Sequence, residues 1–154
     1  MKTDMVILGI ASIWSIYYTI KIQNLFSGII TLGLIAGIVL EFGKFIEYPN
    51  SGIWVFLIFS GIALLYALFS PKFKPDRRLV LILIVLPVFL YWLFFLNNLQ
   101  GANYLWIGLF IPFGSVLYGV TKPVNLRTEW GFVIIFLAEA LTHIYPKIIT
   151  FNIF

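Results

Sequence analysis

Cysteine is absent from this chain of 154 residues, and histidine occurs once, at His143. The lack of cysteine excludes disulfides, thiolate metal sites and thiol redox chemistry. A single histidine excludes bis-histidine haem ligation and the histidine-rich centres of di-iron enzymes. We therefore expect no metal and no cofactor, and these absences remove most redox functions.

Charge is also scarce. Only 10% of the residues are charged and 62% are hydrophobic, whereas soluble domains are about 25% charged and 45–50% apolar. A domain of this size buries only about two thirds of its surface on folding, so the apolar excess must face lipid. The composition predicts an integral membrane protein whose main partner is the bilayer. The net charge of +4 then indicates membrane topology rather than nucleic-acid binding.

Six apolar runs have about the 17 to 25 residues that a transmembrane helix needs. They are Met5–Ile22, Leu25–Ile46, Gly52–Phe69, Leu79–Leu96, Tyr104–Val120 and Trp130–Ile149. The short connectors leave no room for a soluble domain. The sequence therefore predicts one membrane domain over residues 1–154, an all-α polytopic helix bundle with six antiparallel spans. The connector KIQN is so short that the first two runs could instead form one bent element, which would leave five spans.

Basic residues are concentrated in alternate connectors. The first, third and fifth connectors hold Lys21, Lys72, Lys74, Arg77, Arg78, Lys122 and Arg127, whereas the other side has only Lys2, Lys44 and Lys147. The positive-inside rule places the basic connectors in the cytoplasm. We therefore expect a protein of the cell inner (cytoplasmic) membrane with both termini on the non-cytoplasmic side. In this topology Trp54, Trp92 and Trp106 lie near the outer interface, as an aromatic belt does.

Small and polar residues mark the buried faces of helices in lipid, because they allow close backbone approach. The second run has Gly33 and Gly37 at such a spacing, and the third run has Ser60, Ala63 and Ala67. The fourth run, Leu79–Leu96, contains no small residue, so we expect that helix to be peripheral and to face lipid or a partner.

The sixth run carries an acid near its middle, Glu139, and His143 follows four residues later on the same helix face. An ionised carboxylate at that depth costs on the order of 3 kcal/mol on insertion scales. The second run crosses in the same direction, and Glu41 and Lys44 lie near its outer end. We therefore expect the second and sixth helices to meet, with these four residues forming a polar cluster in the outer half of the membrane.

Three prolines lie in or near the ends of the runs: Pro87, Pro112 and Pro146. A proline removes the hydrogen bond to the carbonyl four residues earlier, so Pro87 would free the carbonyl of Leu83. In the same way, Pro112 would free the carbonyl of Gly108 and Pro146 that of Thr142. The Thr142 carbonyl would lie beside Glu139, which makes Thr142 a further candidate for binding a ligand or ion. The remaining charges have simpler interpretations. Glu47 and Glu129 lie at span ends, as interfacial charges do, and the segment from Asp76 to Arg78 reads as a solvated loop.

Three functions fit these observations. A non-enzymatic subunit or scaffold of a larger membrane complex is favoured, because the chain has no soluble domain to couple energy. Its expected partners are other membrane subunits or further copies of itself. The alternative is a small transporter, channel or ligand-binding subunit that uses the Glu/His cluster. A lipid-modifying enzyme is the third, with Glu139 and His143 as its acid–base pair. No catalytic residue is predicted otherwise.

Overall fold

The computed structural model describes residues 2–43, 48–99, 101, 104–122 and 124–151, and these described residues form helices without a strand. The elements are α1 (Lys2–Ile22), α2 (Leu25–Gly43), α3 (Ser51–Phe69), α4 (Pro75–Leu96), the 3-10 helix η1 (Leu105–Phe110), α5 (Ile111–Thr121) and α6 (Trp130–Phe151). Helices α1, α2, α3, α4 and α6 are long and apolar enough to cross a membrane, and η1 with α5 forms a shorter apolar segment. The predicted all-α membrane bundle is confirmed.

The first two runs are separate helices, joined by only two residues. Gln23 adopts a positive φ of 51°, which turns the chain sharply after α1. Asn24 then caps α2, because its side-chain oxygen accepts a hydrogen bond of 3.2 Å from the backbone N–H of Ser27. The single bent element that KIQN allowed is therefore not formed.

The fifth run is the irregular one. Its first turns are the 3-10 helix η1, and Pro112 lies in the first turn of α5, where its missing N–H breaks no helical hydrogen bond. The carbonyl of Gly108, which the sequence predicted to be free, accepts a hydrogen bond from the N–H of Ile111. Pro112 thus begins a helix instead of interrupting one.

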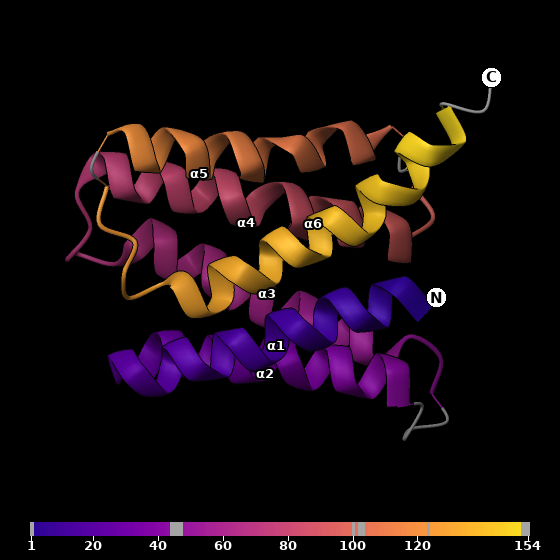
Figure 1. Cartoon of the computed structure of the whole chain (residues 1–154), viewed down its shortest axis with the longest axis horizontal. Helices are drawn as coiled ribbons and strands as arrows, with labels where there is room; N and C mark the ends of the chain where they lie inside the picture. Colours follow the sequence, from indigo (N-terminus) through magenta and orange to yellow (C-terminus); the bar gives the residue numbers. More distant parts are fainter. Residues whose placement is uncertain (1, 44–47, 100, 102–103, 123, 152–154) are drawn as a thin grey trace.

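Helix α6 is the centre of the bundle. It packs against α1, α2, α4, η1 and α5, and Figure 1 shows it crossing between the α4–α5 pair and the α1–α2 pair. Half of its most apolar stretch is buried, compared with 17% for α1. The prediction that the second and sixth helices meet is confirmed by the contact between α2 and α6.

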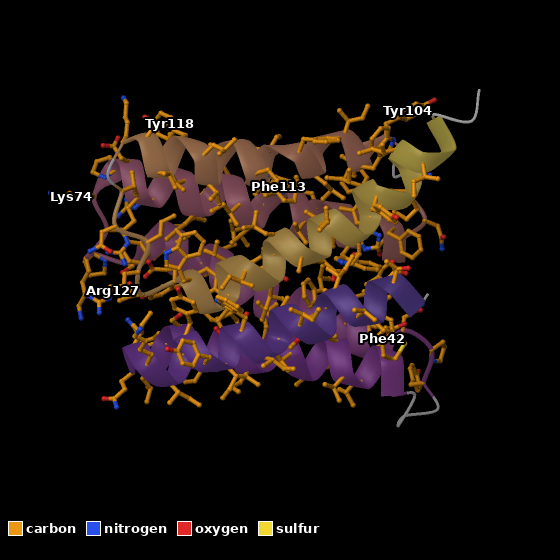
Figure 2. The ribbon with its side chains drawn as sticks, in the orientation of Figure 1. Phe42, Lys74, Tyr104, Phe113, Tyr118 and Arg127 are labelled. Atoms are coloured by element: carbon orange, nitrogen blue, oxygen red, sulfur yellow. The ribbon has the colours of Figure 1, made fainter. Side chains whose placement is uncertain are left out.

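The bundle has two distinct ends. The start of α1 and the end of α6 lie at one end, which we call the termini end (Figure 1). Lys74 and Arg127 lie at the other, the basic end, which also holds Tyr118, whereas Phe42 and Tyr104 lie at the termini end (Figure 2). The alternation of basic connectors in the sequence thus becomes a separation of charge along the bundle.

The small-residue faces point inward as expected. Ser60, Ala63 and Ala67 of α3 are fully buried. The prediction that the fourth helix is peripheral is wrong, because the α4 residues Val80, Leu81, Ile84, Val85 and Val88 are at most 1% exposed. Helix α4 packs on α3, α5 and α6 through interlocking large side chains. Apolar character does not separate lipid-facing from buried residues in a bilayer, so a helix without small residues is compatible with either position.

Candidate functional site

A pocket with a volume of about 300 Å³ opens near the termini end of the bundle. Its polar lining consists of Asp4, Glu41, Trp92, Glu139, Thr142 and His143, and the rest of its wall is mostly apolar. Asp4 is in the first turn of α1 and Glu41 is in the last turn of α2. Because successive helices are antiparallel, the start of α1, the end of α2, the start of α3 and the end of α4 all lie at this end, where they line the pocket together with α6.

Glu139 is the most buried acid of the pocket, with 5% of its surface exposed. Its Oε1 atom accepts a hydrogen bond of 2.9 Å from the indole Nε1 of Trp92. The same Oε1 lies 3.1 Å from Nε2 of His143. A carboxylate in an apolar medium needs such partners. Both partners use one oxygen, so Oε2 has no hydrogen bond from the described residues and remains available to the pocket.

His143 is enclosed by aromatic rings from α4. Its ring centroid lies 4.7 Å from that of Tyr91 and 4.9 Å from that of Trp92. The Tyr91 hydroxyl lies 3.5 Å from Nδ1. If Glu139 is ionised it only accepts hydrogen bonds, so Nε2 would carry the proton that faces it, and Nδ1 of a neutral ring would accept from Tyr91. This arrangement fixes one orientation of the imidazole.

Two glycines bring Glu41 to the pocket. A Cβ on Gly52 would lie 2.3 Å from the backbone N of Glu41 and 2.4 Å from the carbonyl O of Gly37. Helices α2 and α3 therefore touch backbone to backbone at this point, as small residues allow. Gly33 is equally confined, against the ring of Phe59. The Gly33–Gly37 pair is thus used within the chain, and Glu41 follows it by one turn onto the pocket wall.

The structure brings four of the five predicted site residues to one pocket: Glu41, Glu139, Thr142 and His143. No hydrogen bond joins Glu41 to Glu139 among the described residues. The Thr142 hydroxyl donates to the main-chain oxygen of Glu139, at 2.8 Å, and not to its carboxylate. Lys44 lies outside the described residues. That these groups bind a ligand or ion stays a prediction.

Sequence reasoning missed two polar residues of this pocket, Asp4 and Trp92. Trp92 was assigned to the outer aromatic belt, but its indole N–H points to Glu139. Tryptophan at an interface has the same sequence context whether its N–H faces water or a buried acid, so only the packing of α4 on α6 distinguishes the two. Asp4 is an acid in the first turn of a helix. Such an acid interacts favourably with the helix dipole whatever the helix packs against, so its position does not indicate a pocket.

A second polar centre joins the starts of α4 and α6 at the basic end. Arg77 places Nη2 2.6 Å from Oε2 and 2.7 Å from Oε1 of Glu129, and it also contacts the hydroxyl of Thr128. Thr128 donates to the same carboxylate at 2.5 Å. The interfacial assignment of Glu129 is wrong, because its side chain is fully buried while Arg77 is 20% exposed. The solvated-loop assignment is likewise wrong, because Asp76, Arg77 and Arg78 lie at the start of α4 and Nη2 of Arg78 donates to the carbonyl of Ser70 at 3.2 Å.

Glu129 is buried because of the path of the connector before α6. Leu126 is buried, and its carbonyl accepts hydrogen bonds from the backbone N–H groups of Glu129 and Trp130, at 2.9 and 3.1 Å. This turn directs Glu129 toward α4. Burial raises the pKa of the Glu129 carboxyl, while the hydrogen bonds from Thr128 and Arg77 act in the opposite direction. Arg77 also lies over the ring of Phe73, 4.6 Å from its centroid, so this centre is a fixed structural link.

Comparison with protein-family models, with curated proteins and with solved structures finds no match. The chemistry of the pocket is therefore judged from its own geometry. Within the described part of the chain, no group of three or more His, Asp or Glu residues is placed to hold a metal ion. The arrangement suits a ligand held by one buried carboxylate and an apolar wall better than an ion held by a shell of oxygens.

Proposed function

We propose that this protein is a non-enzymatic, multi-pass protein of the cytoplasmic membrane that binds a small ligand in the pocket at its termini end. In this role it is a ligand-binding subunit of a larger membrane assembly or a small transporter. The observation that carries the proposal is the Glu139 carboxylate, which is buried in the pocket wall with one oxygen held by Trp92 and His143 and the other left to the pocket.

The size and composition of the pocket support this role. A volume of about 300 Å³ is at the lower end of the range for ligand pockets, which is roughly 300–1,000 Å³. Such pockets combine an apolar lining with a few polar groups of fixed orientation. Here Ile38, Ile53 and Phe56 contribute apolar wall, and Glu139 is held in place by its two hydrogen bonds.

Thiol labelling tests whether the pocket is open to a water-soluble molecule. The chain has no cysteine, so a single Thr142→Cys substitution gives one reactive group in the pocket wall. We expect a small neutral methanethiosulfonate to label it in detergent-solubilised protein. The matched control is Leu141→Cys, one residue away on the exposed, lipid-facing side of α6, where detergent covers the thiol and labelling is slow.

Asn97→Cys provides the positive control, because Asn97 is exposed at the end of α4. If the reagent labels Asn97→Cys but leaves Thr142→Cys as unreactive as Leu141→Cys, the pocket does not admit ligands and the proposed function is wrong. Labelling of Thr142→Cys at a rate closer to that of Asn97→Cys supports it.

A scaffold role without a ligand is the second candidate, and one observation favours it. The Trp92–Glu139 hydrogen bond joins α4 to α6, so the polar cluster also serves as a clamp between helices. A scaffold should retain other membrane proteins after purification in mild detergent, and mass spectrometry would identify them. A protein that purifies as a monomer or homo-oligomer, with Thr142→Cys open to labelling, would instead favour independent ligand binding.

A further inference from the structure

Acidic side chains line the part of the pocket wall that the structure describes. Its described lining contains three carboxylates, Asp4, Glu41 and Glu139, and no lysine or arginine. The titratable groups come from each side: Asp4 from α1, Glu41 from α2, Tyr91 beside the pocket on α4, and Glu139 with His143 from α6. Helix α3 contributes no titratable lining residue. A concave surface lined by one sign of charge concentrates ions of the opposite sign.

The open oxygen of Glu139 is a second, independent indication. Oε1 accepts from both Trp92 and His143, while Oε2 has no hydrogen bond from the described residues although the side chain is only 7% exposed. Oε2 is not one of the fully buried polar atoms without a partner among the described residues, so it is accessible from the pocket that Glu139 lines. A ligand that brings a positive charge or an N–H group to Oε2 would be attracted to it, whereas an anion would be repelled.

The remaining wall restricts the kind of cation. Leu8, Ile38 and Phe56 give the pocket an apolar side, which a bare inorganic ion does not use. Trp92 also lines the pocket and adds aromatic surface to that wall. A compact molecule with a charged nitrogen and a short carbon body would contact all of these groups.

We infer that the pocket binds a small organic cation, a protonated amine or a quaternary ammonium, whose charged nitrogen lies beside Oε2 of Glu139 and whose carbon body lies on Leu8, Ile38 and Phe56. This inference rests on the proposed function, because it assigns the class of ligand to the same pocket. Glu41 attracts the cation to the pocket mouth, and Glu139 holds it inside.

The charge of the labelling reagent tests this inference directly. Thr142→Cys is treated in turn with trimethylammonium-ethyl, sulfonatoethyl and neutral methyl methanethiosulfonates. The rates are divided by those at exposed Asn97→Cys, which corrects for the reactivity of each reagent. We expect the corrected ratio of cationic to anionic rates to be about tenfold or more, because acidic clefts raise the local concentration of cations by that order.

Measuring the corrected ratio of cationic to anionic labelling rates in Glu139→Gln and Glu41→Gln backgrounds shows which carboxylate causes the preference for cations. We expect Glu139→Gln to remove most of it, while the rate of the neutral reagent stays close to that of the parent protein. The neutral rate is the control for folding, since a collapsed or unfolded pocket would change it. A Glu139→Gln protein with an unchanged neutral rate and an unchanged cation preference would overturn the role of Glu139.

Protection by a ligand completes the test. Choline and 3,3-dimethylbutan-1-ol have nearly the same shape and differ in the charged nitrogen. We expect choline to slow the labelling of Thr142→Cys by the neutral reagent, and the neutral alcohol to have much less effect. Equal protection by both, or equal corrected rates for the cationic and anionic reagents, would overturn the cation inference and leave the proposed ligand pocket standing. Failure of all three reagents at Thr142→Cys would overturn both.

Discussion

The indole Nε1 of Trp92 on α4 lies 2.9 Å from Oε1 of Glu139 on α6. This contact joins two helices at residues that are 47 positions apart in the sequence, and it gives the buried acid a hydrogen-bond donor. The aromatic side chain thus has a polar role inside the bundle, and not only at a membrane interface.

Substitution of Trp92 by phenylalanine should destabilise the protein, because it removes the N–H while keeping an aromatic ring. We expect a loss of about 1 kcal/mol in the free energy of unfolding in mixed detergent micelles, within the range measured for hydrogen bonds between transmembrane helices. Trp54→Phe is the matched control, since Trp54 is 45% exposed. Equal losses for the two variants would show that the hydrogen bond contributes nothing beyond ring size.

The contact between α2 and α3 should be sensitive to a single methyl group. A Cβ at Gly52 would meet only backbone atoms at 2.3 to 2.6 Å, and neither helix can yield without moving. We expect Gly52→Ala to cost about 1–3 kcal/mol of unfolding free energy, as overpacking does, and to widen the pocket. Gly114→Ala is the control, because no atom lies within 4 Å of its added Cβ. A stable Gly52→Ala protein would contradict the close approach.

The ion pair between Arg77 and Glu129 should behave as a buried pair. Arg77→Ala leaves a buried carboxylate without its partner, so we expect a loss of about 3–5 kcal/mol. Arg127→Ala, in the exposed part of the α5–α6 connector, should change the unfolding free energy by no more than about 0.5 kcal/mol. The double variant Arg77→Met with Glu129→Leu should recover much of the loss. If the double variant is as unstable as Arg77→Ala, the loss comes from packing and not from charge.

The loss in Arg77→Ala should depend on pH. Burial raises the pKa of Glu129 above about 4.5, and Arg77 lowers it, so removing Arg77 raises the pKa further. The folded state then binds the proton more tightly than the unfolded state. This tighter proton binding stabilises the folded state fully below a pH of about 4.5, and the stabilisation is lost as the pH rises through the pKa of Glu129 in the folded state. Unfolding measured from pH 4.5 to 7 should show a steeper decline for Arg77→Ala than for the parent protein.

Glu129→Gln in the Arg77→Ala background is the control for this pH dependence, because the amide does not titrate. Its unfolding free energy should lack the steeper decline. If the unfolding free energies of Arg77→Ala and of Arg77→Ala with Glu129→Gln fall in parallel as the pH rises, Glu129 is not the titrating group.

The orientation in the membrane is a prediction of the charge pattern that labelling in cells can test. Asn97 lies at the termini end, and Asn125 is exposed beside the basic residues Lys74 and Lys122. With both termini outside, a membrane-impermeant sulfonatoethyl reagent should label Asn97→Cys in intact cells and Asn125→Cys only after permeabilisation. The reverse pattern would place the basic end outside, against the positive-inside rule.

The run lengths and breakers of the sequence determined the helices closely. Leu25 begins the second helix and Leu96 ends the fourth, as the apolar runs predicted. Helix α4, however, begins at Pro75, four residues before its run, and the fifth run is divided between η1 and α5. The small residues of α3 also identified its inward face correctly, since they are needed wherever helices approach closely. The shared face of Glu139 and His143 follows from helical spacing alone, and their 3.1 Å contact confirms it.

The tertiary structure alone decided which residues join that pair. Trp92 and Asp4 come from other helices, and their side chains carry no local sign of which neighbour they meet. In the sequence, Glu129 is an acid at a span end and nothing marks it as buried. In the structure, the α5–α6 connector places it beside Arg77. The physical reason is that apolar side chains are equally stable in a bilayer whether they face lipid or the bundle interior. The sequence therefore specifies the spans, while the packing of large side chains, as on α4, determines which helices are neighbours.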